Sequence, residues 1–192
     1  MTGLAHTFAL AGPLALVAAI AASIATRAGL KGRLAGVASA AAAVVALVPV
    51  GGTSLVSGLL GFFDTLSMTT ILLLSLAIVS LTTGRSGVTG SRHDRAFIAL
   101  VLLAAAIVLY PSTMGLLSTD IYAIGFGGFM LPAVLGVMLA YAAYNGLVVV
   151  PATIGLALAA WLLAIGESRN LWDYLLDPVA VVVSIMGALR RD

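Results

Sequence analysis

The sequence has no cysteine and very little charge. Without cysteine, the chain can form no disulfide, thiolate nucleophile, zinc–thiolate site or iron–sulfur cluster. Charged residues make up only 8% of the 192 residues, whereas soluble domains usually carry about 25%. Because so few charges cannot cover a water-exposed surface, we expect the lipid bilayer to be the solvent for most of the chain.

Sequence motifs that carry chemistry are also missing. The chain has no Gly-x-Ser-x-Gly nucleophile elbow, no Ser-x-x-Lys pair and no phosphate-binding P-loop. The glycine-rich stretch 125–128 has neither a preceding strand nor a lysine, so it predicts close helix packing instead. A net charge of +2 is too small to predict nucleic-acid binding, and we expect no nucleic-acid partner.

What the sequence does contain is a series of long apolar runs, since 62% of its residues are hydrophobic and the mean hydropathy is +1.20. A helix needs about 20 apolar residues to cross about 30 Å of hydrocarbon, and a helix satisfies its own backbone hydrogen bonds in lipid. Six runs approach that length, at residues 8–26, 34–50, 65–83, 96–110, 125–144 and 146–165, and a seventh at 178–189 reaches it only if its helix starts at Leu171. We therefore predict an all-α polytopic bundle of about seven spans, six plus a short last one kinked at Pro178. It would form a single integral membrane domain over residues 1–192, with no soluble domain.

The basic residues predict the orientation, because cytoplasmic loops are enriched in lysine and arginine. In a seven-span arrangement, eight of the nine fall on one side, within 27–33 and 85–95 and at the C-terminus. Only Arg169 falls on the other side. We therefore expect a multi-pass protein of the cell membrane, in a bacterial inner membrane, with its N-terminus outside and its C-terminus in the cytoplasm. No ionisable residue is predicted near the middle of a span, which argues against a proton-coupled pump or transporter.

Acidic residues gather on the predicted outer side. Five of the seven carboxylates fall there, together with Arg169: Asp64, Asp120, Glu167, Asp173 and Asp177. Asp64 is expected to N-cap the span that begins at residue 65, and Asp120 is expected to cap or turn the chain. The same side would carry the apolar segment 51–63, which glycine and serine interrupt. We expect that segment to lie along the membrane interface or to re-enter the membrane.

The stretch ESRNLWDYLLDP, residues 167–178, concentrates four charged residues within 12 positions. Asn170 can N-cap a helix, with Asp173 as its capping-box partner three residues on. Asp177 can N-cap a second helix that begins at Pro178, or Pro178 can kink one continuous helix. These interpretations make the acids structural.

A functional interpretation of the same stretch starts from the spacing of Asp173 and Asp177, which share a face if the helix is continuous. With Glu167 they could bind a divalent cation through oxygen ligands, or act as acid and base on a lipid headgroup. Arg169 could hold a phosphate or carboxylate through its planar guanidinium group. We otherwise expect no cofactor and no metal site.

Aromatic side chains accompany these charges near the predicted outer interface. Rings with one polar end favour the headgroup level of a bilayer. We therefore predict an interfacial group made of Tyr110, Tyr122, Trp172 and Tyr174.

Three functions remain open at this point. The favoured one is a non-catalytic subunit or accessory factor, whose acidic outer face binds another membrane protein or a lipid headgroup. It is favoured because the connections are short and no catalytic constellation is present. The second is a membrane-embedded enzyme that uses carboxylates on a lipid or lipid-linked substrate at the outer leaflet. The third is a homo-oligomeric channel or carrier for cations that the acidic layer concentrates.

Overall fold

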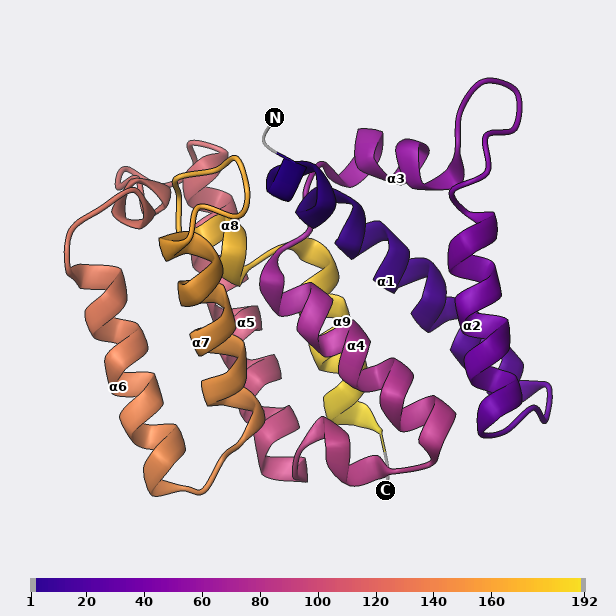
Figure 1. Cartoon of the computed structure of the whole chain (residues 1–192). Helices are drawn as coiled ribbons and strands as arrows, with labels where there is room; N and C mark the ends of the chain where they lie inside the picture. The colour runs from indigo at the N-terminus through magenta and orange to yellow at the C-terminus, as the bar shows by residue number, and fades with distance from the viewer. Residues whose placement is uncertain (1–2, 191–192) are drawn as a thin grey trace. The chain divides into compact units, whose positions relative to one another are not determined.

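The computed structural model describes residues 3–190, and 73% of these residues are helical. No strand occurs in this range, and Val50 and Thr53 form only an isolated bridge. The prediction of an all-α fold is therefore confirmed. The chain divides into two compact units, each of which is a group of helices (Figure 1).

The first unit consists of residues up to Leu66 together with Ile71–Thr89. It contains α1 (Gly3–Arg27), α2 (Arg33–Val45), α3 (Leu55–Phe63), most of α4 (Met68–Thr83) and the 3₁₀ turn η1 (Ser86–Thr89). Both α2 and α3 pack against α1. Gly12 of α1 also lets the segment after α3 approach closely, because a Cβ atom on Gly12 would lie only 2.6 Å from the Cβ of Leu66.

The second unit consists of Ser67–Thr70 and the residues from Gly90 onward. It contains α5 (Arg92–Thr113), the 3₁₀ turn η2 (Tyr122–Gly125), α6 (Met130–Tyr144), α7 (Val149–Leu162), α8 (Trp172–Leu175) and α9 (Pro178–Leu189). The helix α5 packs against α7 and α9, while α6 packs against α7. In Figure 1, α5 and α7 run in one direction and α6 and α9 in the other.

Every predicted apolar run contains a helix, but most helices are shorter than their runs. Three helical segments are long and apolar enough to cross a membrane: Gly3–Arg27, Ser86–Thr113 and Trp172–Leu189. The helices α2, α4, α6 and α7 have 13 to 16 residues, or about 20–24 Å at 1.5 Å per residue. These lengths are compatible with a membrane protein, while the predicted seven spans and the orientation stay predictions.

The last predicted span is interrupted. Helix α8 ends at Leu175, and Leu176 and Asp177 have extended backbone conformations before α9 begins at Pro178. The Asp177 side chain accepts a 2.8 Å hydrogen bond from the Ala180 N–H. The predicted N-cap and first-turn proline are therefore confirmed, and a continuous helix kinked at Pro178 is wrong. Proline fits this position because the first N–H groups of a helix have no intrahelical partner.

The predicted N-cap role of Asp64 is also wrong. Asp64 instead ends α3, with a φ of 55° in the left-handed region. Helix α4 begins at Met68, where the Ser67 hydroxyl accepts the Thr70 N–H at 3.2 Å. The sequence places a good N-capping residue at both positions, and the helix at 55–63 decides between them because Asp64 directly follows it.

Candidate functional site

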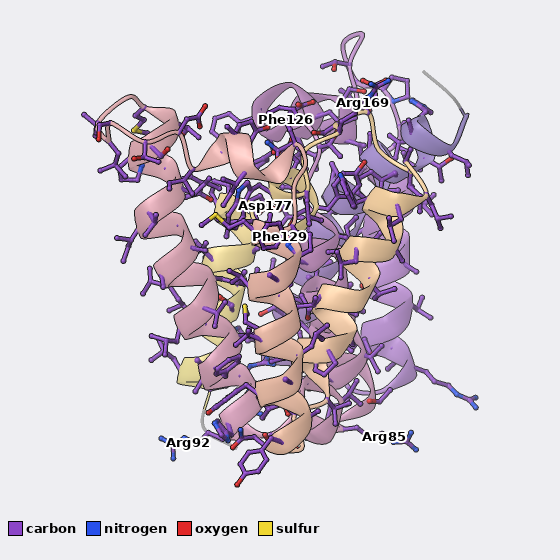
Figure 2. All side chains as sticks on the ribbon, turned by 90° about the vertical axis from the view of Figure 1, so that its left-hand side faces the viewer. Arg85, Arg92, Phe126, Phe129, Arg169 and Asp177 are labelled. Atoms are coloured by element: carbon purple, nitrogen blue, oxygen red, sulfur yellow. The ribbon has the colours of Figure 1, made fainter. Side chains whose placement is uncertain are left out.

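The second unit has one acidic end and one basic end. Figure 2 shows Arg92 at one end and Arg169, Asp177 and Phe126 toward the other. We call the end that carries Asp120, Glu167, Arg169, Asp173 and Asp177 the acidic end. Four of the five predicted outer carboxylates therefore lie at one end of this unit, and the fifth, Asp64, belongs to the first unit.

Asp177 joins the beginnings of two helices. One carboxylate oxygen caps α9 through Ala180, and the other accepts hydrogen bonds from the Ser67 N–H at 2.7 Å and the Thr70 hydroxyl at 2.6 Å. Ser67 and Thr70 belong to the start of α4, so the carboxylate lies at two helix N-termini. Each N-terminus carries a partial positive charge. These contacts make the role of Asp177 structural.

Asp94 does the same at the opposite end of the second unit. It forms a capping box with Ser91 at the start of α5, and its other oxygen accepts the N–H groups of Val148 and Val149 at 2.9 and 3.1 Å. Asp94 is only 2% exposed. Our sequence analysis missed this role, although the Ser-x-x-Asp spacing is a recognisable signal for a capping box.

Asp173 is held by two hydroxyl groups rather than by a helix N-terminus. It accepts hydrogen bonds from the Tyr122 hydroxyl, at 2.8 Å to the nearer oxygen, and from the Ser168 hydroxyl at 2.5 Å. Burial, followed by the hydrogen bond to Asp173, raises the pKa of Tyr122 to about 12. Tyr122 therefore stays protonated at neutral pH and donates to Asp173. The Asp173 carboxylate thus already has two hydrogen-bond donors within the fold.

Asn170 ties this segment to η2. Its amide nitrogen donates to the Tyr122 carbonyl at 3.0 Å, and its side-chain oxygen accepts the Trp172 N–H at 3.0 Å. The Leu171 N–H donates to the Gly125 carbonyl at 2.8 Å. The predicted capping box of Asn170 and Asp173 is therefore wrong, because Asn170 instead bridges two segments and Asp173 turns toward Tyr122.

A glycine makes this approach of the two segments possible. A Cβ atom on Gly125 would lie 1.9 Å from the side-chain oxygen of Asn170. Trp172 adds a hydrogen bond from its ring nitrogen to the Ile121 carbonyl at 3.1 Å. Residues 170–173 are thus fastened to residues 121–125 by hydrogen bonds.

The predicted interfacial aromatics differ in their surroundings. Tyr174 is 1% exposed, and its hydroxyl donates to the Ser168 carbonyl. Tyr122 and Trp172 are half-buried and hydrogen-bonded as described above. The Tyr110 hydroxyl is buried and finds no hydrogen-bond partner within residues 3–190. Phe126 and Phe129, which the sequence analysis did not single out, are the exposed aromatics of this end.

The remaining charged groups of the acidic end are free to meet a partner. Glu167 and Arg169 are exposed. Asp120 is exposed too, and it turns the chain as predicted by accepting the Ala123 N–H at 3.1 Å. Asp173 and Asp177 do not share a helical face, because the break at Leu176 separates them. This overturns the geometry on which their joint action as an acid–base pair depended.

The described residues also lack the cluster of carboxylates that would bind a divalent cation most simply. Within the described part of the chain, no three histidine, aspartate or glutamate side chains lie close enough to hold a metal ion together. Two of the three carboxylates considered for that role, Asp173 and Asp177, already accept hydrogen bonds from protein donors. A divalent cation at the other carboxylates stays a prediction.

Comparison of the chain with known proteins gives no match. No protein-family model matches the chain, and no curated protein or solved structure is detectably similar to it. The function must therefore be argued from the residues themselves.

Proposed function

We propose that the chain is an integral membrane protein of seven spans, with its N-terminus outside and its C-terminus in the cytoplasm of a bacterial cell. Three helical segments long enough to cross a bilayer support the membrane assignment. The charge difference between the two ends of the second unit supports the orientation, because basic groups favour the cytoplasmic side. Four shorter helices would cross by thinning the bilayer locally, at a cost of fractions of a kcal/mol per Å.

We propose further that the protein is a non-catalytic subunit or accessory factor, and that its acidic end binds another membrane protein. The observation that carries this proposal is that the charged residues of the acidic end fall into two groups, one bonded within the fold and one exposed. Asp173 and Asp177 are occupied by hydrogen bonds within the fold, whereas Glu167, Arg169 and Asp120 are exposed.

The network beneath the exposed charges favours recognition. Asn170, Trp172 and Leu171 fasten the segment that carries Glu167 and Arg169 to η2. A surface that is already ordered loses little conformational entropy when it binds. Charges on such a surface give specificity and speed association more than they add affinity.

Purification in mild detergent tests this proposal. We expect the wild-type protein to co-purify with a defined membrane protein, and the double variant Glu167→Gln/Arg169→Gln to lose that partner while staying folded. The control is Arg92→Gln, an exposed charge at the opposite end of the second unit, which should retain the partner.

Other outcomes would replace the proposal. A protein that always purifies alone and turns over a lipid substrate would favour the membrane-enzyme hypothesis. Binding that anionic or zwitterionic lipids reproduce without any protein would make the partner a lipid headgroup. Cation flux in proteoliposomes of the purified chain would favour the homo-oligomeric channel.

A further inference from the structure

Helix α3 presents three distinct faces. At 100° per residue, Val56, Leu60 and Phe63 point one way, and Val56 is 1% exposed in the first unit, where α3 packs on α1. Leu55, Leu59 and Phe62 form a second, apolar face. Leu55 is 57% exposed and Phe62 80% exposed.

The third face is small and polar. It consists of Ser54, the N-cap of α3, together with Ser57, Gly58 and Gly61. All but Ser54 are exposed, and the two serine hydroxyls lie 2.9 Å apart. One side of α3 is thus covered by protein, one is suited to hydrocarbon and one is suited to water or polar headgroups.

The surroundings of α3 select lipid as the partner of its apolar face. No ionisable residue occurs from Leu34 to Phe63, so α2, α3 and the segment between them offer no charged side chain to a protein partner. The Val56 N–H donates to the Ala46 carbonyl, so α3 begins beside the end of α2, where Val44, Val45, Leu47 and Val48 are exposed too. A bilayer covers exposed apolar side chains of this kind without any specific contact.

The ends of α3 exclude a crossing of the membrane. Nine residues span about 13 Å at 1.5 Å per residue, less than half the hydrocarbon thickness. The glycines at 51 and 52 turn the chain before the helix, and Asp64 ends it. Figure 1 shows α3 lying crosswise to α2. The non-helical backbone at both ends needs water or headgroups as hydrogen-bond partners.

We propose that α3 is an interfacial helix that binds the lipid surface, with Leu55, Leu59 and Phe62 among the upper acyl chains and Ser57 and Gly61 facing the headgroups. This arrangement is that of helices that lie in the plane of a membrane interface. The proposal rests on the proposed membrane insertion of the chain, and it does not depend on which side is outside.

Spin labelling tests the proposal directly, because the chain has no cysteine to remove. Single-cysteine variants Phe62→Cys and Ser57→Cys are labelled, reconstituted into phosphatidylcholine vesicles, and measured for collision with oxygen and with a water-soluble nickel chelate. We expect a several-fold higher ratio of oxygen to nickel collisions at position 62 than at position 57. Val37→Cys, on an exposed site of α2, serves as the control for bilayer insertion.

Each outcome has one meaning. Equal nickel access at positions 57 and 62, with oxygen access at 37, would place α3 in water and overturn the proposal. Two oxygen-rich labels at 57 and 62 would make α3 a re-entrant segment, and a label at 62 shielded from both reagents would mean a protein partner. Nickel access at position 37 would instead contradict membrane insertion itself.

Discussion

The hydroxyl of Thr70 donates a 2.6 Å hydrogen bond to the carboxylate of Asp177, which lies 107 positions later in the chain. The same carboxylate caps α9 through Ala180. One side chain therefore holds the first turns of two helices, and its contribution to stability should exceed that of an ordinary N-cap.

Replacing Asp177 tests this double role. An N-cap typically contributes about 1 kcal/mol, and hydrogen bonds to a charged group contribute about 1.5–3 kcal/mol. We expect Asp177→Ala to lower the free energy of unfolding by about 2–4 kcal/mol, measured by denaturant titration in detergent. Asp177→Asn, which keeps one of the two oxygen acceptors, should lose less. Glu167→Gln, an exposed change, should stay within about 0.5 kcal/mol of wild type, and an equal loss there would contradict the assignment.

Within the capping box at the start of α5, the loss of Asp94 should lower the stability of the fold more than the loss of Ser91. Asp94→Ala removes the acceptor of the Val148 and Val149 N–H groups and leaves the buried Val149 donor unpaired, at a cost of about 1–3 kcal/mol beyond the local cap. Ser91→Ala removes only the local cap, at about 1 kcal/mol. Thermal unfolding of the two variants compares these losses. Equal shifts in the two variants would mean that the contact with the start of α7 contributes nothing.

Gly125→Ala should separate η2 from the segment 166–177. The added Cβ would lie 1.9 Å from the Asn170 side-chain oxygen, so one of the segments must move. Overpacking of this kind typically costs about 1–3 kcal/mol. Gly127→Ala is the matched control, because its Cβ would meet open space two residues away. We expect limited proteolysis to cut the Gly125→Ala protein near residues 166–170 faster than the control.

The raised pKa of Tyr122 predicts a loss of folding stability at high pH. An ordinary tyrosine has a pKa of about 10, whereas the pKa of Tyr122 in the folded protein is raised to about 12. The unfolded chain therefore releases this proton first as the pH rises from about 10 to about 12, and folding stability falls across that window. Below pH 10 the contribution is fully present. Ultraviolet titration of Tyr122→Phe should lose the absorbance change of one tyrosine near pH 12, and the loss of a change near pH 10 instead would refute the raised pKa.

The orientation can be tested with two further cysteine variants. Ser86→Cys lies between α4 and α5, and Leu116→Cys lies in the exposed connection after α5. A membrane-impermeant maleimide added to intact cells should label position 116 and spare position 86 until the cells are opened. The reverse pattern would invert the proposed orientation while leaving the helical fold intact.

The sequence predicted the features that depend on short-range chemistry. Hydropathy located every long helix, and the Asp177-Pro178 pair predicted the start of α9. Asp120 was expected to turn the chain and does so. These features depend on a few neighbouring residues, whose preferences act before the tertiary structure is complete.

The rest of the candidate site depends on partners far away in the chain. Asp94 meets Val148 54 residues later, and Tyr122 meets Asp173 51 residues later. Nothing near Asp173 in the sequence distinguishes a capping role from a tyrosine contact. The N-cap prediction for Asp64 was wrong for a different reason. The helix at 55–63 was too short to be recognised as a span, so its end at Asp64 was not predicted.

The contact between Asp177 and the start of α4 also sets an order of events during synthesis. Ser67 and Thr70 leave the ribosome more than a hundred residues before Asp177 does, so their donors must wait for a carboxylate that has not yet been made. The final helix thus completes a junction begun near the first third of the chain. A premature stop just before codon 177 would damage a segment that had been translated long before it.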